Sequence, residues 1–130
     1  MPILDTVVLF AAADARDERH GKAVEYMRRL KERGYLIAGF AMVEFDIVLK
    51  SRGLDSDERM RIHALLMKDY PEVKKKVAPV SPLVLYHTAR LEKEGLEYFD
   101  AGVAAQALLL DGVVVTTDVE LERAGARRIW

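Results

Sequence analysis

Short apolar runs alternate along the chain with longer segments in which apolar residues recur at helical spacing. The apolar runs predict strands at 2–4, 35–38, 77–80 and 113–116, and a small edge strand at 126–130. The helical spacing predicts a helix that follows the charged break at 14–19 and ends at Gly34, and further helices over 40–52, 55–68, 83–94 and 119–124. Another helix is predicted to begin at Asp100.

The segment 6–13 is apolar throughout and fits two descriptions. It either extends the first strand or turns at Asp5 and continues as a buried helix, and its three terminal alanines favour the helix. Strands that alternate with helices predict a three-layer α/β fold, in which helices flank a central, mostly parallel sheet of four to five short strands. We find no repeat or linker and expect one domain over 1–130.

The composition excludes several classes of protein. The chain has 130 residues, no cysteine and a formal net charge of -1, so disulfides and thiolate zinc sites are excluded and the overall charge does not indicate a nucleic-acid binder. The first residues do not resemble a signal peptide, and no uncharged apolar stretch could span a bilayer. We therefore expect a cytoplasmic protein that is not inserted in a membrane.

Four acidic residues lie where apolar elements begin or end. Asp5 follows the first predicted strand, Glu44 lies early in the helix after the second, and Asp118 follows the fourth. Asp100 begins the helix that leads to the fourth strand. Because ligands bind at the carboxyl ends of parallel strands, we expect these four side chains to meet at one end of the sheet.

Electrostatics limits what such a cluster can be. Two carboxylates about 4 Å apart repel by about 4 kcal/mol at an effective dielectric constant near 20. A divalent cation removes this repulsion, and ligands that are all oxygen favour Mg²⁺ or Mn²⁺ over zinc. Such an ion polarises a phosphoryl oxygen and lowers the pKa of bound water, which is the chemistry of phosphodiester hydrolysis.

Each acid also has an interpretation that needs no metal. Asp100 and Asp118 could each serve only as helix N-caps. Asp5 could have a purely structural role, and Glu44 could be an ordinary solvated carboxylate. The prediction of a metal site therefore depends on the set of four and on its order along the chain.

Four short motifs, taken together, resemble the PIN-domain family and its small stand-alone prokaryotic type, to which VapC toxins belong. They are Leu4-Asp5-Thr6 with the apolar run after it, Val43-Glu44-Phe45, Phe99-Asp100-Ala101 with Ala104-Ala105-Gln106-Ala107, and Val114-Val115-Thr116-Thr117-Asp118. The resemblance extends over essentially the whole chain. The sequence departs from the family pattern at Val103, where a histidine is frequent, and at Leu121, where an aromatic residue is usual.

The resemblance implies a compact α/β fold and a metal-dependent endoribonuclease that uses Mg²⁺ or Mn²⁺. It implies that Asp5, Glu44, Asp100 and Asp118 form the acidic set, and that Thr116 is the hydroxyl residue at the floor of their pocket. It also implies a homodimer and, for a toxin of a VapBC-type pair, inhibition by a small antitoxin protein.

Residues that contact an RNA substrate are expected near the mouth of this site. Basic side chains bind backbone phosphates, and Thr6 is the small polar residue after the first acid. The candidates are Thr6, Arg16, Arg19, Lys22, Lys50 and Arg52.

Two other functions compete with a ribonuclease. The domain could be a non-catalytic PIN-fold module for binding or dimerisation, with its acids intact. It could also be a phosphotransferase that forms an aspartyl phosphate on Asp5. That chemistry needs a second acid two residues later, where this chain has Val7, and the sequence therefore argues against it.

Overall fold

A five-stranded sheet forms the centre of the molecule in the computed structural model, which describes residues 1–32 and 34–130. The strands are β1 (Ile3–Leu4), β2 (Leu36–Ala38), β3 (Val77–Ala78), β4 (Val113–Val115) and β5 (Arg127–Ile129). Their order is β3-β2-β1-β4-β5, and every neighbouring pair is parallel. The predicted α/β fold with a central parallel sheet is confirmed, with β5 at an edge.

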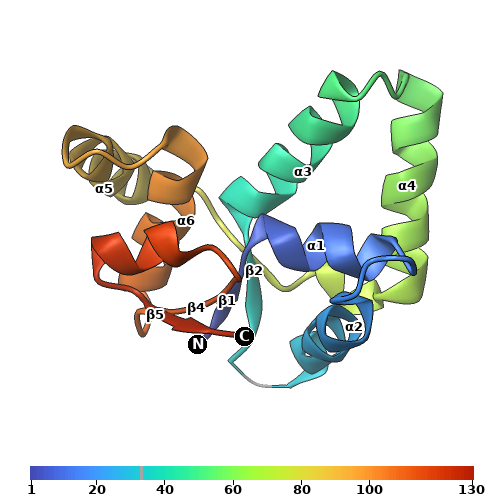
Figure 1. The fold of residues 1–130 in the computed structure, drawn as a ribbon, viewed down its shortest axis with the longest axis horizontal. Helices are drawn as coiled ribbons and strands as arrows, with labels where there is room; N and C mark the ends of the chain where they lie inside the picture. Colours follow the sequence, from blue (N-terminus) through green and yellow to red (C-terminus); the bar gives the residue numbers. More distant parts are fainter. Residues whose placement is uncertain (33) are drawn as a thin grey trace.

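Helices cover both sides of this sheet, so that α5 and α6 lie on the opposite side of the molecule from α2 and α4 (Figure 1). The α-helices are α1 (Thr6–Ala13), α2 (His20–Arg28), α3 (Gly39–Ser51), α4 (Ser56–Asp69), α5 (Pro82–Lys93) and α6 (Tyr98–Leu108). Short 3₁₀ helices are η1 (Arg29–Lys31), η2 (Pro71–Lys74) and η3 (Val119–Ala124). None of the described helices has the length and hydrophobicity that a bilayer crossing requires.

Segment 6–13, for which the sequence allowed either a strand or a helix, forms the helix α1. It packs between the sheet and its neighbours, so Val8, Leu9 and Ala11 are fully buried and no polar face was needed. The helix before Gly34 ends earlier than predicted, since α2 stops at Arg28 and continues as η1; position 33 of the predicted helix lies outside the described residues. Leu65 lies at helical spacing in the predicted helix 55–68, which predicts an inward-facing side chain, but it is 56% exposed.

One buried amide joins α6 to the ends of two strands. Gln106 is 2% exposed; its Oε1 accepts a hydrogen bond from the Phe40 backbone N–H at 3.1 Å, and its Nε2 donates to the carbonyls of Ala78 at 2.9 Å and Pro79 at 3.1 Å. Phe40 opens α3, and Ala78 ends β3. The amide therefore fixes α3 and α6, the helices that carry Glu44 and Asp100, against one end of the sheet.

Close contact between the same two helices requires a glycine. A Cβ added to Gly102 of α6 would lie 2.5 Å from the ring of Phe40, closer than real Cβ contacts allow. Phe40 is itself buried, so its ring has little room to move. Gly102 therefore sets how closely α6 approaches α3.

We predict that Gln106→Leu destabilises the protein by about 2–4 kcal/mol. The substitution leaves the Phe40 N–H and the two carbonyls without their buried partner, while leucine has a similar volume. Urea unfolding of both proteins measures the loss. Gln106→Glu keeps the acceptor for the Phe40 N–H but turns a carboxylate oxygen toward the two carbonyls, so at neutral pH it is expected to destabilise at least as much as leucine. A leucine variant as stable as wild type contradicts this role.

Candidate active site

The acids lie where the connectivity of the sheet reverses. From β1 the chain adds β2 and β3 on one side, and then β4 and β5 on the other, so the reversal falls between β1 and β4. Leu4 pairs with Val115 across this junction, and the next residues along the two strands are Asp5 and Thr116. Crevices at such a point are the usual ligand sites of open α/β sheets.

Asp5 links the end of β1 to the start of α1. It is 6% exposed, its Oδ1 accepts the Thr6 N–H at 2.7 Å, and its Oδ2 accepts the Thr116 hydroxyl at 2.8 Å. Burial raises the pKa of this carboxyl, the two hydrogen bonds oppose the rise, and the charge of Asp118 adds to it. Asp5 is therefore both a helix cap and a desolvated acid that faces another acid.

Thr116 connects Asp5 to the backbone of Asp118. Its hydroxyl donates to Asp5 and accepts the Asp118 N–H at 3.0 Å, and the residue is fully buried. The Asp118 carboxylate accepts the Glu120 N–H at 2.9 Å, so it caps η3, as the structural interpretation of Asp118 predicted. The cap leaves its other carboxylate oxygen outside that hydrogen bond.

Glu44 reaches the same place from the second turn of α3. Its carboxylate accepts a hydrogen bond from the Thr6 hydroxyl, which ties α3 to the start of α1. Partial burial raises the pKa of Glu44, and the hydrogen bond from Thr6 partly offsets this rise. The negative charges of Asp5, Glu97 and Asp118 raise the pKa further. Glu44 is therefore not the solvated carboxylate of the structural interpretation.

Asp100 is not the N-cap of its helix, which corrects the structural interpretation of this residue. The cap of α6 is Glu97, whose side chain accepts the Asp100 N–H at 3.3 Å. Asp100 is the third residue of the helix. Its pKa is raised to about 7, chiefly by burial and to a smaller extent by four neighbouring negative charges, those of Asp118, Asp5, Glu97 and Glu44. Glu97 is the acid that the sequence interpretation missed; glutamate is not among the preferred N-cap residues, so no local signal in the sequence identifies this cap.

The four acids line one pocket, here called the acidic pocket, which has a volume of about 600 Å³. Thr6 also lines it, and Thr116 lies buried behind its wall. Within the described residues, no group of three or more histidine or acidic side chains has the arrangement that holds a metal ion. The structure thus brings the predicted acids around one cavity, with several of their oxygens engaged in capping and hydroxyl contacts.

Of the predicted substrate-contacting cations, Arg19 and Arg52 also line the acidic pocket. Arg16 lies outside it and pairs with Asp14 at 3.1 Å. Lys22, on α2, lies 3.9 Å from Glu25, and Lys50 is an exposed residue of α3; neither lines the acidic pocket. The structure therefore groups two of the five basic candidates with the acids.

Val103 and Leu121, the two residues that depart from the family pattern, are both buried. Val103 is 1% exposed and Leu121 is fully buried, and both belong to the hydrophobic core. Neither lines the acidic pocket. Both positions therefore contribute packing in this protein.

We predict that Thr116→Val lowers stability by about 1–3 kcal/mol, because valine removes the hydroxyl that Asp5 and the Asp118 N–H share. Valine has nearly the same shape, so packing is preserved. Thermal unfolding measures the change, and Thr116→Ser, which keeps the hydroxyl, is the matched control. Equal losses in the two variants contradict a role for the hydroxyl.

The fold agrees with comparisons to known proteins. The chain belongs to the PIN domain family, whose model matches residues 3–127. Comparison with curated protein sequences gives no match.

Solved structures with the same fold include the crystal structure of FitAcB from Neisseria gonorrhoeae. It superposes with a TM-score of 0.75 at 17% identity, over 100% of this chain and 97% of that chain. VapBC2 from Rickettsia felis, bound to a DNA fragment from its promoter, has a TM-score of 0.68 at 14% identity, over 98% and 96% of the two chains. At these identities the likeness concerns the fold.

Proposed function

We propose that this protein is a divalent-metal-dependent ribonuclease that hydrolyses RNA phosphodiester bonds in the acidic pocket. The observation that carries the proposal is that Asp5, Glu44, Asp100 and Asp118 come from four separate segments and line one cavity. Membership of the PIN domain family supports the same reaction class.

The donor atoms of the pocket suit a hard cation by their chemistry, although no three of the described acids are already arranged around one point. They are carboxylate oxygens and a neighbouring hydroxyl, which suit Mg²⁺ or Mn²⁺. Asp5, Asp100 and Asp118 would hold the ion, and Glu44 would assist. When bound, the ion supplies Lewis-acid polarisation of a phosphoryl oxygen and a more acidic water.

The residues of this chain have distinct tasks in that reaction. Thr116 holds Asp5 through its hydroxyl donor and the Asp118 backbone through its acceptor, so two acids keep one spacing. Thr6 orients Glu44 in the same way. Asp100 has a pKa of about 7, so near neutral pH the metal-free pocket can hold a proton on this carboxyl.

Incubation of the purified protein with a mixed RNA pool tests this function. Cleavage is expected with Mg²⁺ or Mn²⁺ and not with a chelator, and Asp118→Asn is expected to abolish it. The backbone contacts of Asp118 survive in that variant, because the Thr116 hydroxyl still accepts the N–H of residue 118. Absence of metal-dependent cleavage by wild type leaves the non-catalytic binding module as the remaining function.

We further propose that the protein is the toxin of a VapBC-type pair, a homodimer inhibited by a small antitoxin. The support is that solved structures of the same fold are described as FitAcB and VapBC2, the latter bound to promoter DNA. Co-expression with the small protein encoded beside it is expected to yield a stable complex without nuclease activity. Full activity in such a complex contradicts this assignment.

A further inference from the structure

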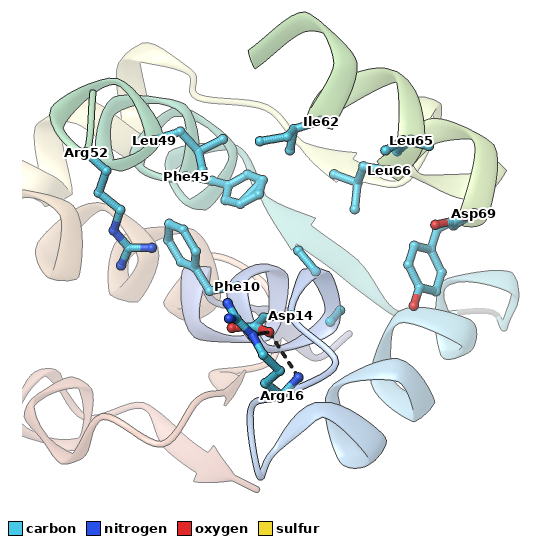
Figure 2. Close-up of a pocket in the computed structure, with 13 residues that line it drawn as sticks. Phe10, Asp14, Arg16, Phe45, Leu49, Arg52, Ile62, Leu65, Leu66 and Asp69 are labelled. Atoms are coloured by element: carbon cyan, nitrogen blue, oxygen red, sulfur yellow. Dashed lines mark hydrogen bonds and ion pairs between the residues drawn. The ribbon is translucent and has the colours of Figure 1, made fainter. Parts of the chain in front are cut away.

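A second, apolar pocket adjoins the acidic one. It has a volume of about 370 Å³, within the range of small-ligand sites, and lies between α1, α3 and α4. Figure 2 shows Phe10 and Phe45 pointing toward each other, with Ile62 and Leu66 reaching into the same space from α4. The two pockets share Phe10, Asp14 and Arg52 as lining residues, so they are adjacent and have one wall in common.

Phe10 and Arg52 form a stacked pair at the junction of the two pockets. The guanidinium of Arg52 lies 4.8 Å from the centre of the Phe10 ring, and the ring meets Phe45 edge to face at 4.7 Å. Phe45 is buried, so Phe10 has a rigid support behind it. Phe10 and Arg52 both line the apolar pocket, so a planar group that enters it meets these two side chains.

The two cations of the acidic pocket differ in what they already bind. Arg19 is held by both carboxylate oxygens of Asp17, at 3.2 and 3.1 Å, and donates to the Thr117 hydroxyl at 3.3 Å. Arg52 is exposed and makes no ion pair within the described part of the chain. Among the cations that line the acidic pocket, Arg52 is therefore the one available to an incoming phosphate.

We propose that the apolar pocket receives an unstacked base of single-stranded RNA, next to the phosphodiester held at the four acids, with the intervening phosphate on Arg52. This inference rests on the proposed ribonuclease function. Protein sites for single strands combine aromatic or guanidinium planes, on which bases stack, with cations that follow the backbone. The wall common to the two pockets supplies both, and a base in a duplex would first have to unpair and unstack, which costs free energy, to enter the apolar pocket.

Charge favours a nucleotide over an apolar protein segment as the occupant. The wall shared with the acidic pocket carries Arg52, whose guanidinium is unpaired among the described residues and lies on an aromatic face, and Asp14, whose carboxylate already pairs with Arg16. The free cation matches a phosphate followed by a flat base, whereas an apolar peptide segment brings no anion to it. The test distinguishes the two occupants.

Cleavage of two matched RNAs tests the proposal. The first is an intact single strand with one cleavage site. The second is the same strand without the base at one position beside the cut, and it is made for each neighbouring position in turn. Loss of the base is expected to lower kcat/KM for wild type by about 5- to 100-fold at one position. Phe10→Leu, which keeps apolar packing, is expected to cause a similar loss on intact RNA and little further loss on that abasic RNA.

Binding separates this inference from the ribonuclease function. Fluorescence anisotropy with Asp118→Asn and Mg²⁺ is expected to show tighter binding of intact than of abasic RNA, and Phe10→Leu is expected to remove the difference. If this dependence appears while no RNA is cut, the ribonuclease function is wrong and the base site stands. Tyr86→Leu, a 67% exposed aromatic on α5, is the matched control and should behave as wild type.

Two results overturn the base site. In the first, removal of the base has the same effect on cleavage and binding at every neighbouring position, both in wild type and in Phe10→Leu. The other is a Phe10→Leu variant that handles both RNAs as wild type does but escapes inhibition by a co-expressed small protein, which assigns the apolar pocket to a peptide.

Discussion

Asp5→Asn is expected to reduce RNA cleavage at least about 100-fold while the protein stays folded. The asparagine Oδ1 can still accept the Thr6 N–H that caps α1. The Thr116 hydroxyl oxygen has two lone pairs. One already accepts the Asp118 N–H, and after rotation of the hydroxyl the other can accept a hydrogen bond from the new amide NH₂. The variant loses the buried negative charge, whose desolvation raises the pKa of Asp5, and it also loses the acceptor of the Thr116 O–H; the first change stabilises the fold and the second destabilises it.

Two measurements on the same preparation check this separation of activity from stability. Single-turnover cleavage of labelled RNA with Mn²⁺ gives the rate, and urea unfolding without metal gives the stability. Glu120→Gln is the matched control, because it removes a nearby but exposed carboxylate on η3. An active Asp5→Asn protein, or an unfolded one, contradicts the role assigned to Asp5.

Asp100→Asn is expected to make the metal-free protein more stable than wild type at pH 8, and equally stable near pH 4. Burial and the neighbouring acids raise the Asp100 pKa to about 7 in the folded state, against about 4 in an unfolded chain. Between these values the folded state binds more protons than the unfolded state, so wild-type stability falls as pH rises. Asp5 and Glu44, with raised pKa values, act in the same direction.

The size of the effect is limited by solvent. Because Asp100 is only half-buried, screening reduces its contribution to about 1–2 kcal/mol at pH 8. Unfolding midpoints across pH 4–8, with a chelator present, measure it. Glu92→Gln, which removes an exposed carboxylate of α5, controls for net charge. A difference between wild type and Asp100→Asn that is constant across this pH range contradicts the explanation.

The order of elements could be predicted because local patterns and tertiary packing agree. Asp55 caps α4 at the start of the predicted helix, through a capping box with Glu58, and Ser81 followed by Pro82 begins α5. The alternation of strands and helices identified the parallel sheet. The strand order could not be predicted, since the side on which each crossover returns depends on contacts such as those of Gln106, which join distant segments.

Prediction of individual side chains was less complete. Leu65 has helical spacing but faces the open side of the apolar pocket between α1, α3 and α4, which no local pattern reveals. The same limit applies to Lys22 and Lys50, whose chain positions lie near the acids although their side chains do not line the pocket. The charge of a residue does not show in which direction its side chain points.

The convergence of the four acids was predictable in outline, because parallel strands end at one edge. Their hydrogen bonds were not. The sequence shows neither that Glu97 caps α6 in place of Asp100, nor that Thr116 joins Asp5 to the Asp118 backbone. Such contacts depend on the register between β1 and β4, which only the assembled sheet defines.

Binding of Mn²⁺ tests most directly whether the carboxylates of the acidic pocket act as one cation site. Electron paramagnetic resonance of free Mn²⁺, titrated with the protein at pH 8, gives the affinity for wild type and for Asp100→Asn, Asp118→Asn and Glu92→Gln. The account predicts a site in wild type and in Glu92→Gln that each pocket variant weakens at least about 10-fold. Equal affinity in all four proteins, or no binding by wild type, contradicts it.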